Sequence, residues 1–366
     1  MPLQVSFIFG GISTEYDGSI SSLTNIISSY LAIPDAERPF SVRYLYHVSR
    51  NDGLVRTIRF HRAFTISELQ GYLYDTNARS GRSLLVTFDT IKSRNEYIVN
   101  LLHGQFGEDG GVQTLAALSC LRGTFGDPRV ASLTMNKYAM SSFVSSILPS
   151  EIVKVPTATL VNPGNAADAI KTAKSLQRPI VVKPNSLGSS LFARLFRDPE
   201  QSEQEIEALL HAIFAYDSAA LLQEFIPGDE YTCGCLVGSS GAIPLPVVKI
   251  ETNMQFFGRD QKQSRSAAKR AVIDTDDEIS SIIQSVTHSV ASSINLCNMA
   301  RFDFRVSHDS VIWFLECNYI PGLSKNGSFE KMLHHYGMTV VDLISWIASD
   351  SRPFIKPAHY IKYECI

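Results

Sequence analysis

A segment near the C-terminal end of the chain holds the side chains best suited to chemistry, namely Asp303, Glu316, Asn318 and Arg301. Side chains alternate along a strand, so Glu316 and Asn318 project to the same side, where Asp303 of a facing strand can meet them. Two carboxylates and an amide oxygen at one end of a sheet suit a hard cation that also holds phosphate oxygens, as Mg²⁺ does. Arg301 lies two residues before Asp303 and would balance charge in the same site.

A hairpin is needed to bring these groups together. The sequence predicts strands at Ala300–Val306 and Val311–Glu316, joined by a polar turn and followed by a Pro321–Gly322 loop. An edge hairpin with polar tips is the competing interpretation for any one of these residues. However, Glu316 ends an apolar strand, where an uncompensated buried carboxylate would be costly. That cost favours a ligand for Glu316.

The composition is that of an ordinary folded protein, with 45% hydrophobic and 19% charged residues. At 366 residues the chain exceeds a single core, so two or three domains are expected. A net charge of −3 gives no argument for a basic surface that would bind nucleic acid or membrane, and no apolar run has membrane-spanning length. The six cysteines are scattered and no secretory leader is visible, so we expect a cytoplasmic protein with reduced thiols.

Strands and helices alternate along the chain, which predicts an α/β fold. In the first third we expect a helix at Ile20–Tyr30, a helix through Leu115–Leu121, and strands around Val5–Phe9, Val42–His47, Leu84–Thr87 and Tyr97–Leu102. Farther on we expect helices at 134–147, Ala166–Leu176, Ile206–Phe214 and Val340–Ala348, and strands at Thr157–Val161, Pro179–Lys183, Leu191–Phe196, Ala220–Glu224, Tyr231–Val237 and Ile243–Ile250. Thr275 and Glu278 have the spacing of a capping box that opens a further helix.

Three loops stand out between these elements. Residues 103–113, HGQFGEDGGVQ, are too polar for a core element and are interpreted as a loop that carries function, with a plain turn as the alternative. Residues 188–190, Gly-Ser-Ser, would expose backbone N–H groups suited to phosphate, although such a sequence is often only a turn. Residues 251–271 are polar and without period, which predicts a long mobile loop, or disorder without a role.

Four segments resemble the D-alanine–D-alanine ligases in order and spacing: FGGISTEYDGSISS, LLHGQFGEDGGVQ, VVKPNSLGSS and RFDFR…LECNYIPGLSKNGS. The resemblance covers most of the chain. It implies the α/β (α+β) ATP-grasp fold, in which ATP is held between two β-sheets. It also implies three domains, for which we expect the boundaries 1–132, 133–222 and 223–366.

The resemblance further assigns an ATP site. Lys137 and Lys183 would contact the phosphates, as compact point charges suited to that task, and Lys183 ends an apolar strand, which disfavours a solvent role. The remaining expected contacts are Ser189 and Ser190 in the phosphate-binding loop, Gln223, Glu224 and Ile226 at the adenine, and Glu230 at the ribose. Asp303, Glu316 and Asn318 take the metal positions, with two Mg²⁺ ions expected and Mn²⁺ as a substitute.

The family mechanism implies a substrate site as well. A donor carboxylate attacks the γ-phosphate of ATP, and an acceptor amine then displaces phosphate from the acyl carbon. Arg301 would stabilise charge on the acyl phosphate and the tetrahedral species. The resemblance places Glu15, linked to Ser189, at the donor ammonium, with His103 beside the donor. On the acceptor side it places Gly322 and Ser328, and Lys262 matches the catalytic lysine of the mobile loop.

Departures from the family pattern concentrate in the substrate set. Gly18 stands where a larger aliphatic residue usually narrows the donor pocket, and Gln263 stands where the family has a loop tyrosine. Phe192 replaces a small residue, and Asn136 replaces an aspartate. We therefore expect an ATP-dependent carboxylate–amine ligase for a small amino-acid donor and acceptor, making a non-standard dipeptide in specialised metabolism.

Several alternatives stay open. One is a cell-wall enzyme making D-alanyl-D-alanine or a D-alanine–D-lactate depsipeptide. Another is a nucleotide-binding protein without catalysis, which the full set of Arg301, Asp303, Glu316 and Asn318 disfavours. An ATP-grasp carboxylase using bicarbonate is disfavoured by the N-terminal GGISTE segment. Neither nucleic acid nor membrane is expected as a partner, and a homodimer is possible because the resembling family often forms one.

Overall fold

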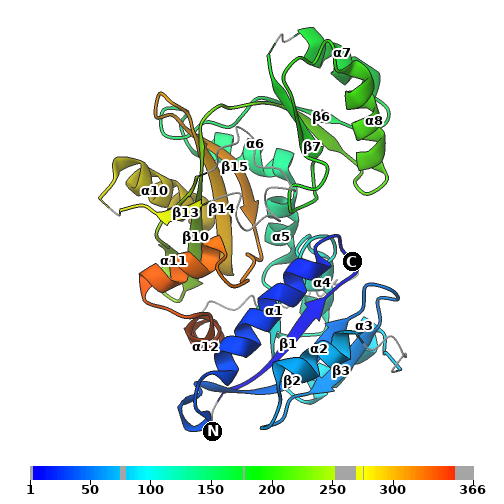
Figure 1. Ribbon diagram of the computed structural model, residues 1–366, viewed down its shortest axis with the longest axis vertical. Coiled ribbons are helices and arrows are strands. Elements are labelled where there is room, and N and C mark those ends of the chain that lie inside the picture. The colour runs from blue at the N-terminus through cyan, green and yellow to red at the C-terminus, as the bar shows by residue number, and fades with distance from the viewer. Residues whose placement is uncertain (1–2, 75–79, 176–177, 252–268, 275, 351–366) are drawn as a thin grey trace, which may run out of the picture.

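The structure, a computed structural model, describes residues 3–74, 80–175, 178–251, 269–274 and 276–350. Three β-sheets organise these residues and follow one another along the long axis of the molecule (Figure 1). The N-terminal sheet lies at the bottom of that view, a six-stranded sheet in the middle and a four-stranded sheet at the top. No helix within the described ranges is long and apolar enough to span a membrane.

The N-terminal sheet has the order β3-β2-β1-β4-β5 and is parallel except for β3. Strand β1 lies at its centre, and helices cover both of its faces, so every residue from Val5 to Gly10 is buried. The strands are β1 (Leu3–Gly10), β2 (Phe40–Val48), β3 (Val55–Arg59), β4 (Tyr97–Asn100) and β5 (Arg122–Gly123). The helical segments are α1 (Tyr16–Leu31), η1 (Asp35–Glu37), α2 (Ile66–Tyr74), α3 (Leu84–Ser93) and α4 (Gly111–Leu118).

The strand predicted at Leu84–Thr87 is wrong, because this segment opens helix α3. Ser83 caps the helix by accepting a hydrogen bond from the backbone N–H of Val86. The buried positions, Thr87, Phe88 and Ile91, have helical spacing. An apolar run of four residues fits a strand and a helix equally well, so the run alone could not decide.

The four-stranded sheet has the order β6-β9-β7-β8 and is antiparallel throughout. Helices α7 and α8 pack against it and share its core with Ile180, Val182 and Leu222. Its elements are β6 (Ala158–Val161), α7 (Ala166–Ser175), β7 (Ile180–Pro184), β8 (Arg194–Phe196), α8 (Glu203–Phe214) and β9 (Ala220–Glu224). This sheet stands apart from the N-terminal sheet in Figure 1, with the six-stranded sheet between them.

The six-stranded sheet runs β13-β12-β10-β14-β15, with β11 paired to β10. Its strands are β10 (Asp229–Gly238), β11 (Gly241–Pro244), β12 (Val248–Glu251), β13 (Lys269–Val272), β14 (Asn298–Val306) and β15 (Ile312–Asn318). The helices around it are α5 (Pro128–Met135), α6 (Lys137–Ile147), α10 (Glu278–Ser293), α11 (Ser328–Tyr336) and α12 (Val340–Asp350). Helix α12 also contacts α1, and one hydrophobic core runs from β1 to α12, which fixes the N-terminal sheet against the C-terminal part.

Three predicted elements differ in this region. The strand expected at Ile243–Ile250 is divided into β11 and β12, where Pro246 has no N–H to donate to a ladder. The helix expected from residue 134 is two helices, which meet at Asn136 in an extended conformation. Helix α10 is capped by Asp277, whose carboxylate accepts from the N–H of Ser280, whereas Thr275 of the predicted capping box lies outside the described residues. Helix α11 was not predicted.

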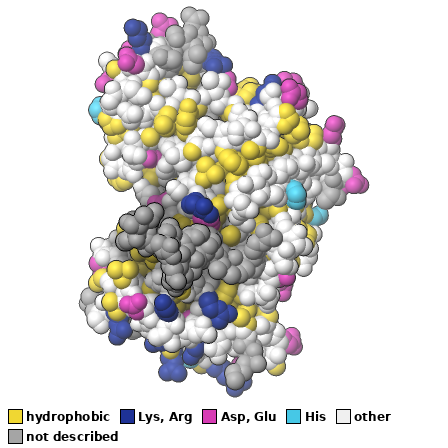
Figure 2. Space-filling model, turned by 180° about the vertical axis from the view of Figure 1, so that it is seen from behind, with side chains coloured by type: hydrophobic (Ala, Val, Ile, Leu, Met, Phe, Trp, Pro, Cys, Tyr) yellow, Lys and Arg dark blue, Asp and Glu magenta, His cyan; other side chains and the backbone are white. Residues whose placement is uncertain are grey.

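The opposite side of the molecule is seen in Figure 2. Lys and Arg side chains gather towards the lower end of this view, which is the N-terminal part of the chain. Hydrophobic side chains lie in small groups over the upper part. The five cysteines within the described ranges are all free thiols.

Candidate active site

A cavity of about 290 Å³ is lined by residues from both the four-stranded and the six-stranded sheet. Most side chains predicted for ATP and metal line it: Lys137, Lys183, Ser190, Gln223, Glu224, Ile226, Glu230, Arg301, Asp303 and Glu316. Gly322 and Ser328, predicted for the acceptor, line it as well. Asn318 instead borders a small adjoining cavity, which it shares with Lys137, Gly188 and Glu316. The structure therefore gathers residues from four separate segments at one place.

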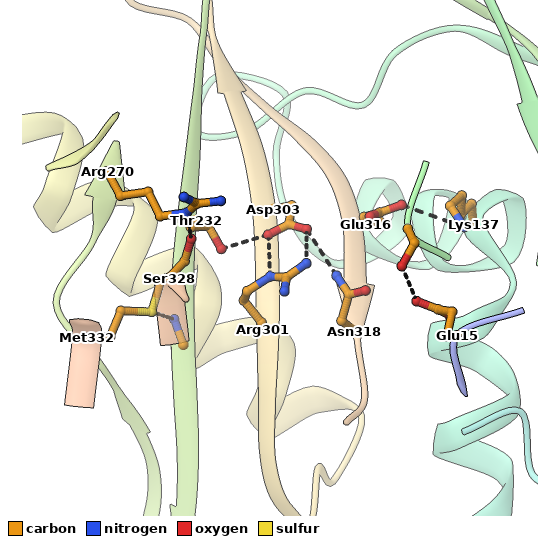
Figure 3. A network of polar contacts seen from close by, with 12 residues as sticks. Glu15, Lys137, Thr232, Arg270, Arg301, Asp303, Glu316, Asn318, Ser328 and Met332 are labelled. Atoms are coloured by element: carbon orange, nitrogen blue, oxygen red, sulfur yellow. Dashed lines mark hydrogen bonds and ion pairs between the residues drawn. The ribbon is translucent and has the colours of Figure 1, made fainter. Parts of the chain in front are cut away.

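The hairpin β14–β15 has the predicted register. Asp303 pairs with Glu316 and Arg301 pairs with Asn318 across the two strands. Arg301 grips Asp303 with two hydrogen bonds, from Nε to Oδ1 at 2.9 Å and from Nη2 to Oδ2 at 2.8 Å (Figure 3). The Asn318 amide donates to Oδ2 of Asp303 at 3.0 Å, and the Thr232 hydroxyl donates to Oδ1 at 2.7 Å. Asp303 is therefore the centre of the network.

Charge within this network keeps Arg301 protonated. Burial acts to lower the pKa of Arg301, but the charges of Asp303 and Glu316 outweigh it and raise that pKa above its usual range. On the far side of Glu316, Lys137 Nζ lies 3.6 Å from the carboxylate and donates to the carbonyl of Leu187 at 2.7 Å. Each carboxylate thus has a cationic neighbour, and Lys137 joins the hairpin to the loop that follows β7.

The donor set fits a hard divalent cation held together with phosphate. Asp303, Glu316 and Asn318 offer carboxylate and amide oxygens, the ligand types that Mg²⁺ takes. Within the described ranges no three His, Cys, Asp or Glu side chains cluster closely enough to form a metal site. An ion here would therefore take its remaining oxygens from outside the protein, as Mg²⁺ does in nucleotide sites. Each oxygen of Asp303 accepts two hydrogen bonds, from Arg301 together with Asn318 or Thr232, so an ion bound to Asp303 would replace some of these contacts.

The edge predicted for the adenine is formed by β9 and the residues after it. Gln223 is buried. The Glu224 carboxylate is held in place because it accepts a hydrogen bond from the N–H of Thr157 and forms an ion pair with Arg178 at 2.7 Å. Arg305 is a residue that sequence reasoning missed. It donates to the carbonyl of Ile226 at 2.9 Å and lies 3.2 Å from the Glu230 carboxylate. The available signal was its spacing, because Arg301, Asp303 and Arg305 fall on one face of β14.

Glu15 and Ser189, which the resemblance assigns to the donor, are in direct contact. The Ser189 hydroxyl donates to Glu15 Oε1 at 2.6 Å, although the residues are 174 positions apart. Glu15 Oε2 is buried and has no hydrogen-bond partner among the described residues. Ser189 and Ser190 both have a φ of 53°, so the loop turns through the left-handed region. A Cβ on Gly188 would stand 2.2 Å from Glu15 Oε2, so the close approach needs glycine there.

His103 and Gly18 lie side by side. A Cβ on Gly18 would be 3.7 Å from Cδ2 of His103. Burial lowers the pKa of His103, so its imidazole is neutral near pH 7. The Ser22 hydroxyl lies 3.2 Å from His103 Nε2 and also accepts from the N–H of Leu323 at 3.0 Å. Ser22 therefore links helix α1 to the loop that carries Gly322.

Gly322 and Ser328, which were predicted to bind the acceptor, line the cavity, and Arg270 donates through Nε to the Ser328 hydroxyl at 3.2 Å. Lys262 and Gln263 lie outside the described residues, as does most of the predicted loop 251–271. Two of the departures from the family pattern have structural contacts. Asn136 caps α6 by accepting from Ala139 N at 2.9 Å, and the Phe192 ring lies 5.5 Å from that of Tyr216.

Glu108 is a second residue that sequence reasoning missed. It lies in the polar loop 103–113 and is buried, and it accepts from Gly104 N at 2.8 Å and from Ile320 N at 3.0 Å. These two bonds join the His103 loop to the loop after β15. Burial, with the charge of Glu15 adding to it, raises the pKa of Glu108 to about 8 despite both N–H donors.

This raised pKa makes stability depend on pH. Below the ordinary carboxyl pKa of 4.5, Glu108 is protonated in both the folded and the unfolded chain, so the free energy of unfolding has its full value there. Between that value and about 8 the folded chain keeps a proton that the unfolded chain has lost, so the free energy of unfolding falls as pH rises. This decline in the free energy of unfolding amounts to at most about 1.4 kcal/mol per pH unit. We expect it to be absent in Glu108→Gln, which has no carboxylate to titrate.

Urea unfolding of wild type and Glu108→Gln from pH 5 to pH 9 measures the effect. The stability difference between the two should shift in favour of the variant as pH rises and level off above about pH 8. Glu151→Gln, on an exposed carboxylate, should run parallel to wild type. A Glu108→Gln profile that also runs parallel to wild type would contradict the raised pKa.

Comparisons with known proteins point to one family. Residues 152–349 match the family model described as the D-ala D-ala ligase C-terminus. A D-alanine–D-alanine ligase of Porphyromonas gingivalis is 25% identical over 346 residues, which cover 94% of this chain and 97% of the relative. The corresponding enzyme of Clostridium beijerinckii is 27% identical over 256 residues, which cover 70% of this chain and 81% of the relative.

Solved structures share the fold. The VanG D-Ala:D-Ser ligase of Enterococcus faecalis superposes with a TM-score of 0.74 at 21% identity, covering 95% of this chain and 98% of that one. The D-alanine–D-alanine ligase of Bacillus anthracis, solved in complex with ATP, gives a TM-score of 0.65 at 20% identity and covers 94% and 96% of the two chains.

Proposed function

Because the chain belongs to the D-alanine–D-alanine ligase family, we propose that it joins two D-alanine molecules at the expense of ATP. The ATP-grasp fold and the ligase class agree with the sequence analysis. The observation that carries the proposal is the cavity itself. It holds Lys137 and Lys183, the Arg301–Asp303 pair and Glu316 together, and the joined Glu15 and Ser189 lie close to Gly188 on its wall.

D-alanine as both donor and acceptor replaces the main sequence-based expectation of a non-standard dipeptide. The curated relatives are D-alanine–D-alanine ligases, and two of them pair with this chain over most of both lengths. That finding favours the cell-wall alternative over specialised metabolism. Of the substituted positions behind the non-standard dipeptide, Gln263 lies outside the described residues.

The chain's own groups suit each part of this reaction. ATP supplies the phosphoryl group that activates the donor carboxylate, and Mg²⁺ held by Asp303, Glu316 and Asn318 would neutralise its phosphate charge. Lys137 and Lys183 would add positive charge on the phosphate side. Glu15 Oε2, which has no hydrogen-bond partner among the described residues, would accept a hydrogen bond from the donor ammonium.

Arg301 has the role with the largest expected effect on the chemical step. Its guanidinium is fixed by two hydrogen bonds to Asp303 before any substrate arrives. A fixed, charged donor at the reacting carbon costs no reorganisation when negative charge develops there. Neutral His103, beside Gly18, would hold the donor without adding a competing charge.

A bulkier donor is the second candidate, and one observation favours it. A Cβ on Gly18 would meet only Cδ2 of His103 within 4 Å, at 3.7 Å, so a methyl-sized group fits at this point without a clash. The donor side chain would then be larger than the methyl group of D-alanine.

Phosphate release with ATP and Mg²⁺ across single and paired D- and L-amino acids, with mass detection of products, tests both candidates. Efficient formation of D-alanyl-D-alanine from D-alanine alone supports the first. A coupled product only from a larger donor supports the second. ATP binding without phosphate release across the panel would indicate a protein that binds ATP without catalysis. Sedimentation of the same sample shows whether the chain forms the homodimer that the family resemblance allows.

A further inference from the structure

Arg270 is a cation of the site that no known part of the ligase reaction uses. It lies on the edge strand β13, opposite Ile250 of β12, and its side chain lines the cavity. Its neighbour Lys269 points away, since the Lys269 side chain is 80% exposed and lies 3.6 Å from Glu251. The alternation of side chains along the strand thus turns Arg270 inward.

The position of Arg270 is fixed from two directions. Its Nε donates to the Ser328 hydroxyl at 3.2 Å, at the first residue of α11. Lys331, one turn along the same helix, donates through Nζ to the carbonyl oxygen of Arg270 at 3.1 Å. The terminal nitrogens of the guanidinium, Nη1 and Nη2, donate to no acceptor among the described residues.

The surroundings of Arg270 contain an excess of positive charge. No carboxylate within the described part of the chain forms an ion pair with it, whereas Arg301 is matched by Asp303. Burial, and after it the charge of Arg301, lowers the pKa of Arg270. The nearest acidic residue on α11, Glu330, is already used by Asn25 and by the N–H of Asn326. A half-buried arginine beside a second arginine is stabilised by an anion.

Arg270 could bind either a phosphate of ATP or the carboxylate of the acceptor, and its position in the site distinguishes the two. Figure 3 shows Arg270 and Ser328 on one side of the Arg301–Asp303 pair, and Glu316, Lys137 and Glu15 on the other. Lys137, and Ser189 with its hydrogen bond to Glu15, are therefore across the hairpin from Arg270. Its hydrogen-bond partner Ser328, and Gly322 of the same cavity, are the residues that the family resemblance assigns to the acceptor.

We propose that Arg270 is the residue that binds the carboxylate of the acceptor amino acid, with Ser328 holding the guanidinium in place. This inference rests on the proposed function and adds to it the residue that recognises the acceptor through its free carboxylate. The planar guanidinium can bind a carboxylate with two parallel hydrogen bonds through the nitrogens left open by Ser328. The carboxylate is the α-carboxylate in D-alanine and the side-chain carboxylate in an acidic acceptor.

The test compares Arg270→Met and Arg270→Lys with wild type in two half-reactions. Hydroxylamine traps the activated donor as a hydroxamate, so hydroxamate formation measures the first half-reaction without any acceptor. Dipeptide formation at varied acceptor concentration measures the second half-reaction. We expect Arg270→Met to raise the acceptor KM about 10- to 100-fold, with ATP KM and hydroxamate formation within twofold of wild type. Arg270→Lys should recover part of the loss, because it restores charge without the planar fork.

The choice of acceptor distinguishes the two carboxylates. D-alaninamide should be a poor acceptor for wild type and no worse for Arg270→Met if the α-carboxylate is bound. If the α-amide of D-aspartate is a good acceptor, Arg270 binds the side-chain carboxylate instead. Lys269→Met, at the exposed neighbouring position, should leave both half-reactions unchanged.

Two outcomes would overturn the proposal. One is an unchanged acceptor KM in Arg270→Met, and the other is a rise in ATP KM alone, which would make Arg270 a phosphate contact. Failure of wild type to form any hydroxamate would instead overturn the proposed function. In that case calorimetric titration with D-alanine would test the role of Arg270 independently of turnover. Equal binding to wild type and Arg270→Met would contradict the inference, and loss of binding in the variant would support it.

Discussion

Asp303→Asn should lower kcat/KM by about a thousandfold or more, and Glu316→Gln by roughly ten times less. Both changes remove one carboxylate of the predicted metal set. Only Asp303 also holds Arg301, through hydrogen bonds of 2.9 and 2.8 Å, and receives further bonds from Asn318 and Thr232. An amide at position 303 keeps one acceptor oxygen and presents an NH₂ group to the guanidinium, so Arg301 loses its alignment.

The two variants differ in what they leave intact. Glu316 has Lys137 Nζ at 3.6 Å, a looser contact, so its loss weakens metal and phosphate binding while Arg301 stays in place. Glu316→Gln should therefore respond to raised Mg²⁺ concentration, whereas Asp303→Asn should recover little. Steady-state kinetics across a Mg²⁺ series, with ATP binding followed by calorimetry, measures both effects.

Asp309→Asn is the matched control, because it makes the same chemical change in the exposed turn of the same hairpin. It should keep wild-type kinetics. Equal losses in Asp303→Asn and Glu316→Gln, with equal response to Mg²⁺, would contradict a separate role of Asp303 in positioning Arg301. Turnover that persists in both would point to a protein whose function is ATP binding alone.

The hairpin could be predicted from sequence because its constraint is local. A strand alternates with a period of two, so Asp303, Glu316 and Asn318 had to share a face once the turn was placed. The Glu15–Ser189 contact joins residues 174 positions apart, and only the family resemblance indicated it. No periodicity within either segment carries information about such a distant partner.

The features that were missed depend on tertiary contacts. Glu108 looks like one more polar loop residue in the sequence, and its meaning comes from burial and from the N–H of Ile320. Arg270 lies on the short edge strand β13, in a stretch too polar and too brief to show a period. The same weakness explains the wrong strand at Leu84–Thr87, where a capping serine and not the apolar run determines the structure.

Removing the carboxylate charge in Glu15→Gln should lower kcat/KM by about 10²- to 10³-fold, and Ser189→Ala by a smaller factor of about 10. Glu15 Oε2 has no partner among the described residues, so it is the acceptor available to a donor ammonium. Ser189 does not touch that oxygen. Its hydroxyl fixes the other one, Oε1, at 2.6 Å, and so sets the direction of the carboxylate.

The double variant Glu15→Gln/Ser189→Ala decides whether the two residues act as a unit. If Ser189 works by orienting Glu15, its loss adds little once the charge is gone, and the double variant should resemble Glu15→Gln within about threefold. Independent contributions would instead multiply. Asp17→Asn, at an exposed carboxylate in the first turn of the same helix, should keep wild-type rates. Because Ser189 is exposed, thermal unfolding of Ser189→Ala should match wild type, so a kinetic loss there reflects the orientation of Glu15 and not the stability of the fold.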